Sequence, residues 1–142
     1  MDCRMTQDQR EVFLAGLHVA VLSLNQPSRG PLSVPVWYWY EPGGELWFET
    51  EPNSRKVRLL EIGARVSLCV QNESPPYAYV SVEGEIIDIA EDDLQKHQIP
   101  MAVRYLGEEG GRDFIASLPS SEWKRYIVKP DRWLSYEGAK AT

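Results

Sequence analysis

A serine and three cations follow one strand-like segment at a spacing suited to binding a phosphate. The four residues are Ser54, Arg55, Lys56 and Arg58, and they come directly after the aromatic run at residues 45–50. Ser54 is a typical helix N-cap, because its hydroxyl can accept a hydrogen bond from a backbone N–H one turn on. Free N–H groups and the macrodipole at a helix N-terminus favour a bound phosphate or carboxylate. The alternative interpretation is a solvated basic turn with no ligand.

The cations in this segment are placed against the macrodipole of the predicted helix. A helix N-terminus prefers anionic side chains, so each cation there costs roughly 0.3–1 kcal/mol. A bound phosphate would make the cations at this position favourable instead. Val57, Leu60 and Ile62 follow the cations at roughly helical spacing, and Gly63 is a candidate left-handed cap. The sequence therefore predicts a helix from Ser54 to the residues before Gly63.

The elements around this segment are mostly strand-like. The first three strands are joined by turns too short for a parallel crossover, so they are expected to pair antiparallel. We predict a mainly β protein of about six or seven strands, with peripheral helices, that forms a small β-barrel in one domain over residues 1–142. The predicted strands cover residues 18–25, 32–40, 45–50, 65–71, 79–89, 123–129 and 132–136.

Helices and special backbone positions complete the prediction. Thr6 and Gln9 form a capping box that opens a short N-terminal helix. Residues 91–106 are predicted to be helical, with Pro100 starting or kinking part of the segment. Residues 107–111 are predicted to form a loop and residues 112–118 a further helical segment. Gly84, inside a long strand, predicts a bulge or a close backbone approach.

The second strand carries an unusual density of aromatic side chains. Two tryptophans and two tyrosines alternate along residues 37–40, so both faces of the strand are bulky. Pro35 lacks an N–H and should lie at a ladder break, a bulge or an edge. Such a break frees the backbone groups of Val36 and Trp37 to bond a planar heterocycle. The other interpretations are a core strand packed under a helix, or a subunit interface.

Composition excludes several classes of protein. The chain has 142 residues, a net charge of −6 and a pI near 5.0, which argues against a nucleic-acid partner. The N-terminus is too polar for a signal peptide, and no apolar run is long enough to span a membrane. Cys3 and Cys69 form no C-x-x-C pair, which indicates a cytoplasmic protein. His18 and His97 are too few and too far apart to predict a metal site.

These motifs together resemble a known family. The order of the motifs along the chain resembles that in the FMN-binding split β-barrel family. The motifs are, in order, Pro35-Val36-Trp37, an aromatic strand ending in Thr50, Ser54-Arg55-Lys56 and Arg65-Val66-Ser67. That family includes pyridoxamine 5'-phosphate oxidase and the flavin- and deazaflavin (F420)-dependent reductases. The resemblance runs from about residue 13 to residue 85, and more loosely to the strand around residue 133.

The resemblance implies a homodimer with two cofactor sites at the subunit interface. Arg55 and Lys56 would bind the cofactor phosphate, with hydroxyl bonds from Ser54 and Thr50. Arg58 is added on helical spacing alone. The ring would be lined by the backbone of one strand and flanked by an acidic residue; these are Val34, Pro35, Val36, Trp37 and Glu49.

The C-terminal substrate motif of pyridoxamine 5'-phosphate oxidase, Arg-Leu-His-Asp-Arg, is absent. The chain instead reads Arg132-Trp133-Leu134-Ser135-Tyr136, and its N-terminus is shorter. We therefore expect an oxidoreductase of the reductase-like branch, acting on an unidentified small molecule, and not a true pyridoxamine phosphate oxidase. Hydride transfer needs no catalytic triad, and the sequence identifies no catalytic residue.

FMN is favoured over F420, because the anionic oligoglutamate tail of F420 needs further basic groups; Arg29, Arg65 and Arg104 are the candidates. The alternatives are a flavin- or haem-binding carrier or sensor of the same fold, and a dimeric interaction module without a cofactor.

Overall fold

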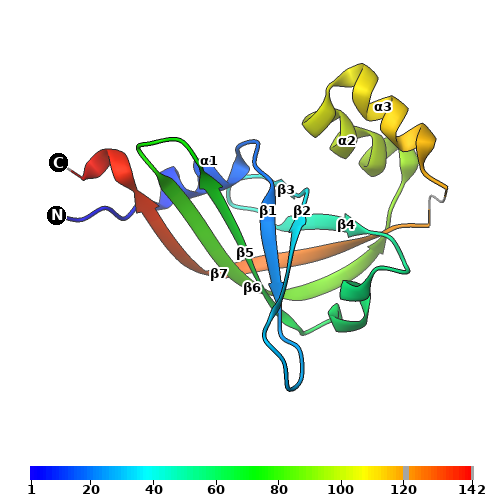
Figure 1. Ribbon diagram of the computed structural model, residues 1–142, viewed down its shortest axis with the longest axis horizontal. Helices are drawn as coiled ribbons and strands as arrows, with labels where there is room; N and C mark the ends of the chain where they lie inside the picture. Colours follow the sequence, from blue (N-terminus) through cyan, green and yellow to red (C-terminus); the bar gives the residue numbers. More distant parts are fainter. Residues whose placement is uncertain (120–121, 142) are drawn as a thin grey trace.

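Seven antiparallel strands form one continuous sheet in the computed structural model, which describes residues 1–119 and 122–141 (Figure 1). The order of the strands across the sheet is β2-β1-β5-β6-β7-β4-β3. This architecture confirms the predicted mainly β class. The strands are β1 (Ala20–Leu24), β2 (Leu32–Val36), β3 (Trp39–Tyr40), β4 (Leu46–Thr50), β5 (Arg65–Asn72), β6 (Ala78–Glu91) and β7 (Lys124–Glu137).

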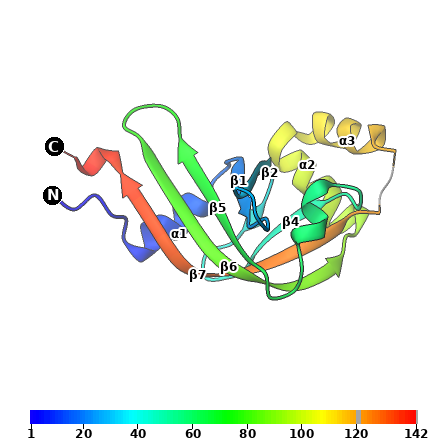
Figure 2. The same ribbon diagram turned by 60° about the horizontal axis from the view of Figure 1, so that its bottom comes forward.

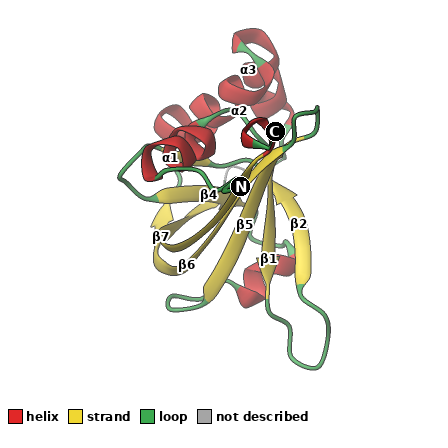
Figure 3. Ribbon diagram, turned by 90° about the vertical axis from the view of Figure 1, so that its left-hand side faces the viewer, coloured by secondary structure: helices red, strands yellow, loops and turns green. Residues whose placement is uncertain are grey.

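The strand order requires the sheet to roll up. Its two edge strands, β2 and β3, are consecutive in the sequence and are separated only by Trp37 and Tyr38. A two-residue link cannot cross a flat seven-stranded sheet, so the sheet curves until its edges meet. Figure 3 shows the strands curving around a common interior, with α1, α2 and α3 on one side. The result is a barrel that is split between β2 and β3.

The interior of the barrel is built by strict alternation along the strands. In β1, Ala20, Leu22 and Leu24 are buried while the intervening side chains face outward. Leu22 lies opposite Leu68 of β5, Leu68 lies opposite Val82 of β6, and all three side chains are fully buried. Strands β5, β6 and β7 run side by side through the middle of the sheet (Figure 2).

The helices lie outside the barrel. The α-helices are α1 (Gln7–Ala15), α2 (Ile99–Leu106) and α3 (Glu108–Ser117), with short turns η1 (Arg55–Leu59), η2 (Leu94–Gln98) and η3 (Gly138–Lys140). Helices α2 and α3 pack on each other as a hairpin between β6 and β7 (Figure 1).

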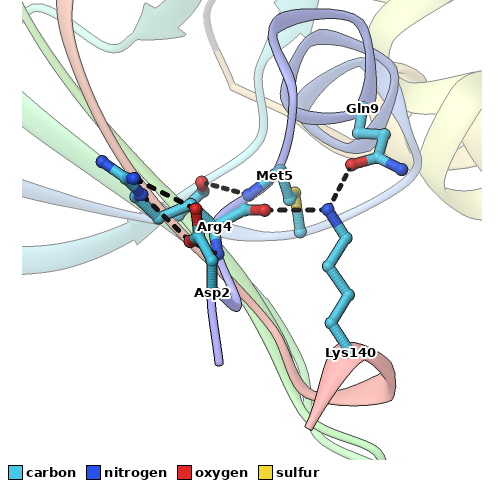
Figure 4. Close-up of polar contacts among 6 residues, drawn as sticks. Asp2, Arg4, Met5, Gln9 and Lys140 are labelled. Carbon is cyan, nitrogen blue, oxygen red and sulfur yellow. Dashed lines mark hydrogen bonds and ion pairs between the residues drawn. The ribbon is translucent and has the colours of Figure 1, made fainter.

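The capping box at Thr6 is confirmed. The Thr6 hydroxyl accepts from the Gln9 N–H at 3.2 Å, and the Gln9 side chain accepts from the Thr6 N–H at 2.9 Å. The same glutamine accepts a bond from Lys140 Nζ at 2.8 Å, and that amine also donates to the Arg4 carbonyl (Figure 4). These bonds hold the two ends of the chain together.

Two predicted boundaries are wrong. Residues 107–111 are not a loop, because α3 begins at Glu108. Gly111 allows this, since a Cβ there would lie 2.5 Å from the Val103 nitrogen of α2, so glycine permits the two helices to approach closely. Residues 123–129 and 132–136 are not two strands but parts of β7, whose pairing with β6 shifts register at Glu83 and Gly84. Pro130 is accommodated at that bulge.

The strand predicted at residues 32–40 is also interrupted. Strand β2 ends at Val36 and β3 begins at Trp39, and Pro35 lies on the edge strand β2, as its missing N–H requires. The Tyr105 hydroxyl of α2 accepts from the Tyr38 N–H at 3.1 Å and donates to the His18 carbonyl at 2.6 Å. A side chain from a distant helix therefore satisfies the backbone at the split.

We expect Tyr105→Phe to lower the free energy of unfolding by about 1–2 kcal/mol, because the Tyr38 N–H and the His18 carbonyl would lose their partner in a half-buried position. Denaturant unfolding measures the change. Tyr77→Phe is the matched control, since Tyr77 is 57% exposed. Equal stability of both variants would show that the hydroxyl bridge contributes nothing.

Candidate functional site

A cavity of about 320 Å³ lies between the split edge of the barrel and the helical hairpin. One wall comes from β2, β4 and the chain after β4, and the other from η2, α2, α3 and Trp123. This volume is at the small end of the range for ligand pockets. The lining residues are mainly apolar: Val19, Pro35, Val36, Trp37, Glu49, Thr50, Glu51, Lys56, Gln98, Ala102, Phe114, Ile115, Leu118 and Trp123.

The aromatic wall of the cavity is fixed by stacking. The Trp37 ring is parallel to the Tyr105 ring, with centroids 4.9 Å apart and an interplanar angle of 5°. Phe114 of α3 packs on the same tryptophan with centroids 5.5 Å apart. Trp37 therefore packs under the helical hairpin while it lines the cavity. The arrangement gives a rigid apolar surface next to the end of β2.

The helix predicted at Ser54 is a five-residue 3-10 turn, η1, and the Ser54 side chain makes no capping bond. Leu60 is buried, but Ile62 is 65% exposed, so the apolar stripe needed to dock a longer helix stops at Leu60. Gly63 has the predicted left-handed backbone but bonds to the Ile86 carbonyl of β6 at 2.8 Å, outside any helix. Any anion affinity of this segment must come from side chains rather than from a helix N-terminus.

Lys56 places a half-buried cation on the cavity wall. Its Nζ donates to the Ser54 hydroxyl at 2.8 Å. Burial lowers the pKa of Lys56, and the nearby Glu51 carboxylate opposes that shift only in part. The ammonium is therefore held where its charge is poorly solvated. A bound anion would stabilise it there.

Thr50 adds a hydroxyl beside the lysine. Thr50 is only 3% exposed and lines the same cavity as Lys56. The hydroxyl donates to the Glu51 carbonyl at 3.5 Å, which is a weak hydrogen bond. Thr50 can therefore donate to a ligand without losing a strong internal bond.

The other members of the predicted set lie off the cavity wall. Arg55 is exposed and donates to the Gln26 side chain at 3.1 Å, and Arg58 is exposed on the same turn. Ser54 accepts the hydrogen bond from Lys56 but does not itself line the cavity. The Val34 side chain packs against the barrel core. The structure brings six predicted residues together on the cavity wall: Pro35, Val36, Trp37, Glu49, Thr50 and Lys56.

A pair of carboxyl groups also lies at this site. Glu49 of β4 lines the cavity, and Asp92, which follows β6, has a side chain with no exposed surface. Burial raises the pKa of both groups, and the Asp92 carboxylate raises the pKa of Glu49 further. Sequence reasoning identified Glu49 as a flank of the site but missed Asp92, because the two residues are far apart in the sequence and no local pattern joins them.

The helical wall was also missed. Phe114, Ile115 and Leu118 of the α3 segment recur at helical spacing, which is a signal for an apolar face but not for a cavity. Gln98 of η2 is buried and reaches the same cavity.

Within the described residues, no group of three or more His, Cys, Asp or Glu side chains is placed to hold a metal ion. Over the same part of the chain, no helix is both long enough and apolar enough to cross a membrane.

Comparison with known proteins identifies the family. The family model for pyridoxamine 5'-phosphate oxidase matches residues 6–132. A search of curated proteins gave no significant match.

Three solved structures illustrate the similarity of fold. A conserved hypothetical protein of Mycobacterium tuberculosis has a TM-score of 0.74 at 22% identity, with 96% of this chain and 88% of that chain covered. An F420 reductase has a TM-score of 0.64 at 22% identity, with 87% and 94% covered. An FAD and heme binding protein of Mycobacterium smegmatis has a TM-score of 0.65 at 16% identity, with 93% and 71% covered.

Proposed function

The chain belongs to the pyridoxamine 5'-phosphate oxidase family, and from that premise we propose that it is an FMN-dependent oxidoreductase acting on a small molecule, with F420 as the alternative cofactor. The C-terminal substrate motif of pyridoxamine 5'-phosphate oxidase is absent, so the proposal does not extend to pyridoxamine phosphate oxidation. The proposed location is cytoplasmic, in keeping with two free cysteines, Cys3 and Cys69.

The observation that carries the proposal is the half-buried Lys56 on the wall of an apolar cavity. A phosphorylated planar ring matches both features, since its phosphate would neutralise the ammonium and its ring would bury against Trp37. Lys56 would hold the phosphate, with donors from Thr50 and Ser54. Arg55 and Arg58, exposed on the same turn, would add positive charge from the rim.

The flat part of the cofactor would lie along the end of β2. The backbone of Val34, Pro35, Val36 and Trp37 would line the ring there, with Glu49 on its flank. When bound, the flavin supplies the electron-transfer chemistry, and the protein supplies binding, orientation and exclusion of water. The cavity residues assigned here contribute only to binding, orientation and exclusion of water.

The basic residues outside the cavity favour FMN over F420. Arg104 donates to the Ala15 and Gly16 carbonyls at the end of α1, and Arg65 forms an ion pair with Asp131 at 2.6 Å. Both are therefore engaged elsewhere, which leaves Arg29 in the exposed β1–β2 turn. A long anionic tail would find little of the extended basic track that it needs.

A haem-binding role has less support, because neither histidine lines the cavity. His18 Nε2 bonds the Phe13 carbonyl at 3.0 Å, and His97 Nδ1 accepts from the Asp93 N–H at 3.0 Å. A histidine ligand for a haem iron would have to come from elsewhere.

A homodimer with the cofactor at the interface is part of the proposal. The outward face of the barrel carries a row of directly paired residues that begins at Pro35 beside the cavity; it continues through Val21, Cys69 and Ser81 to Leu134. Val21 and Leu134 are 43% and 60% exposed. A second copy seated on this apolar row would extend the wall of a cavity that is small for a flavin mononucleotide.

The test is to measure the absorption spectrum and thermal stability of the purified protein with FMN, F420 or haem. We expect FMN at 100 times its dissociation constant to stabilise the fold by about 2.7 kcal/mol, and sedimentation to give a dimer. A colourless protein that none of the three stabilises would contradict the proposal. Bound FMN that cannot be reduced and reoxidised would indicate a carrier or sensor instead.

A further inference from the structure

Glu49 and Asp92 form a buried acidic pair with too few hydrogen-bond donors for two carboxylates. Three of their oxygens, Glu49 Oε2 and both Asp92 carboxyl oxygens, are buried without a donor within hydrogen-bonding geometry among the described residues. The Asp92 side chain has no exposed surface. Each unpaired buried carboxylate oxygen is costly, and two carboxylates that share one site do not both ionise readily.

No neighbouring cation within the described residues neutralises the pair. Asp92 lies 3.7 Å from His97 Nδ1, but that nitrogen accepts from the Asp93 N–H and so carries no proton. Burial lowers the pKa of His97, which keeps the ring neutral. A neutral imidazole whose near nitrogen is already an acceptor offers nothing to Asp92.

Two other groups near the pair, Arg125 and Gln98, favour the ionised form of Asp92. Arg125 of β7 stacks over Trp47 at 5.1 Å and donates to the Glu91 carbonyl at 3.3 Å. Its charge, and the amide of Gln98 of η2, lower the pKa of Asp92 without overcoming the effect of burial. Lys56 and Glu51 carry the remaining charges on the cavity wall.

We propose that the Glu49–Asp92 pair holds a single proton on Glu49, whose O–H donates to the Asp92 carboxylate in the free protein and turns to an acceptor atom of a molecule bound in the cavity. Burial and the adjacent carboxylate both raise the pKa of Glu49, consistent with this arrangement. The shared proton is a property of the protein alone. The donor role rests on the proposed function, and it suits a carbonyl oxygen or an unprotonated ring nitrogen.

The shared proton has a consequence for stability. The native pKa of the pair is raised above the unfolded value, near 4 for both residue types. The protonated native pair therefore contributes its full stability below about pH 4, and that contribution is lost as the pH rises toward the native titration. Asp92→Asn removes one titrating group and its negative charge. The free energy of unfolding of this variant should therefore fall less than that of wild type as the pH rises above about 4.

The decisive experiment is a carboxyl ¹³C NMR titration of the full-length protein labelled at Glu and Asp. We expect one carboxyl resonance assigned to the pair to titrate above about pH 7, and Asp92→Asn to move the Glu49 midpoint downward. Asp93→Asn is the matched control, because Asp93 is exposed and should leave that midpoint unchanged. Ionisation of both wild-type carboxyls near pH 4 would overturn the proposal.

A second arm tests the donor role by FMN titration across pH. Wild-type affinity should fall about tenfold above the NMR midpoint, the size of one lost hydrogen bond. Glu49→Gln keeps an N–H donor and should bind FMN independently of pH over the same range. An identical pH dependence in this variant and wild type would overturn the donor role. Absence of FMN binding at every pH would refute the ligand site and the donor role with it, while the NMR titration alone decides the shared proton.

Discussion

Gly84→Ala is expected to lower the free energy of unfolding by about 3 kcal/mol or more, at the upper end of overpacking effects. A Cβ at this position would lie 2.2 Å from the Lys129 carbonyl oxygen and 2.8 Å from its carbon. Both are backbone atoms of β7, so no side-chain rotation can relieve the overlap. The β6–β7 ladder, which crosses the middle of the sheet, would have to open at its bulge.

Urea denaturation of the two variants Gly84→Ala and Gly30→Ala measures this effect. Gly30 is the matched control, because a Cβ added there would meet nothing within 4 Å and the residue sits in the exposed β1–β2 turn. We expect Gly30→Ala to change stability by less than about 0.5 kcal/mol. Midpoints that coincide for the two variants would show that β7 can move away from β6 at little cost.

Gly84 also shows which parts of the fold the sequence predicts well. Its bulge was predictable because a glycine inside a long alternating strand is a local signal. The same holds for the capping box at Thr6, for β5 with its alternation of buried and outward side chains, and for β1, which is a short, nearly continuous apolar run. Signals of this kind need no knowledge of distant parts of the chain.

The wrong boundaries depend on distant contacts. The interruption after Val36 is stabilised by Tyr105, whose hydroxyl bonds a backbone group 67 positions earlier in the chain. Helix α3 could begin among glycines because Gly111 packs on the backbone of Val103. In both cases tertiary packing overrides a local preference, and no window of sequence contains both partners.

The position of the basic segment beside a cavity was predictable from the sequence, but its local structure was not. The basic segment does border a cavity, yet η1 is too short and too poorly capped to act through a helix N-terminus. Of its three cations, only Lys56 lines the cavity. Asp92 and the α3 wall come from elements whose position relative to β4 is set by the whole fold, so sequence alone gave no indication that they meet Glu49 there.

Lys56→Ala is expected to weaken FMN binding by about 1.5–3 kcal/mol, which is roughly 10- to 150-fold in the dissociation constant. The half-buried ammonium would supply a charge-assisted bond to the phosphate, and alanine leaves the described cavity lining without a cation. Isothermal titration calorimetry measures the loss. Lys56→Arg keeps the charge and should recover most of the affinity if the guanidinium fits.

Two further variants separate a specific contact from bulk charge. Lys96→Ala removes one positive charge from the exposed turn η2 and should leave the affinity unchanged. Arg55→Ala should have a smaller effect than Lys56→Ala, because Arg55 is exposed and bonded to Gln26. If Lys56→Ala and Arg55→Ala both bound FMN as tightly as wild type, this basic turn would not be the phosphate site. A loss confined to Lys56→Ala would instead mean that one lysine, half-buried on the cavity wall, carries the electrostatic part of cofactor recognition.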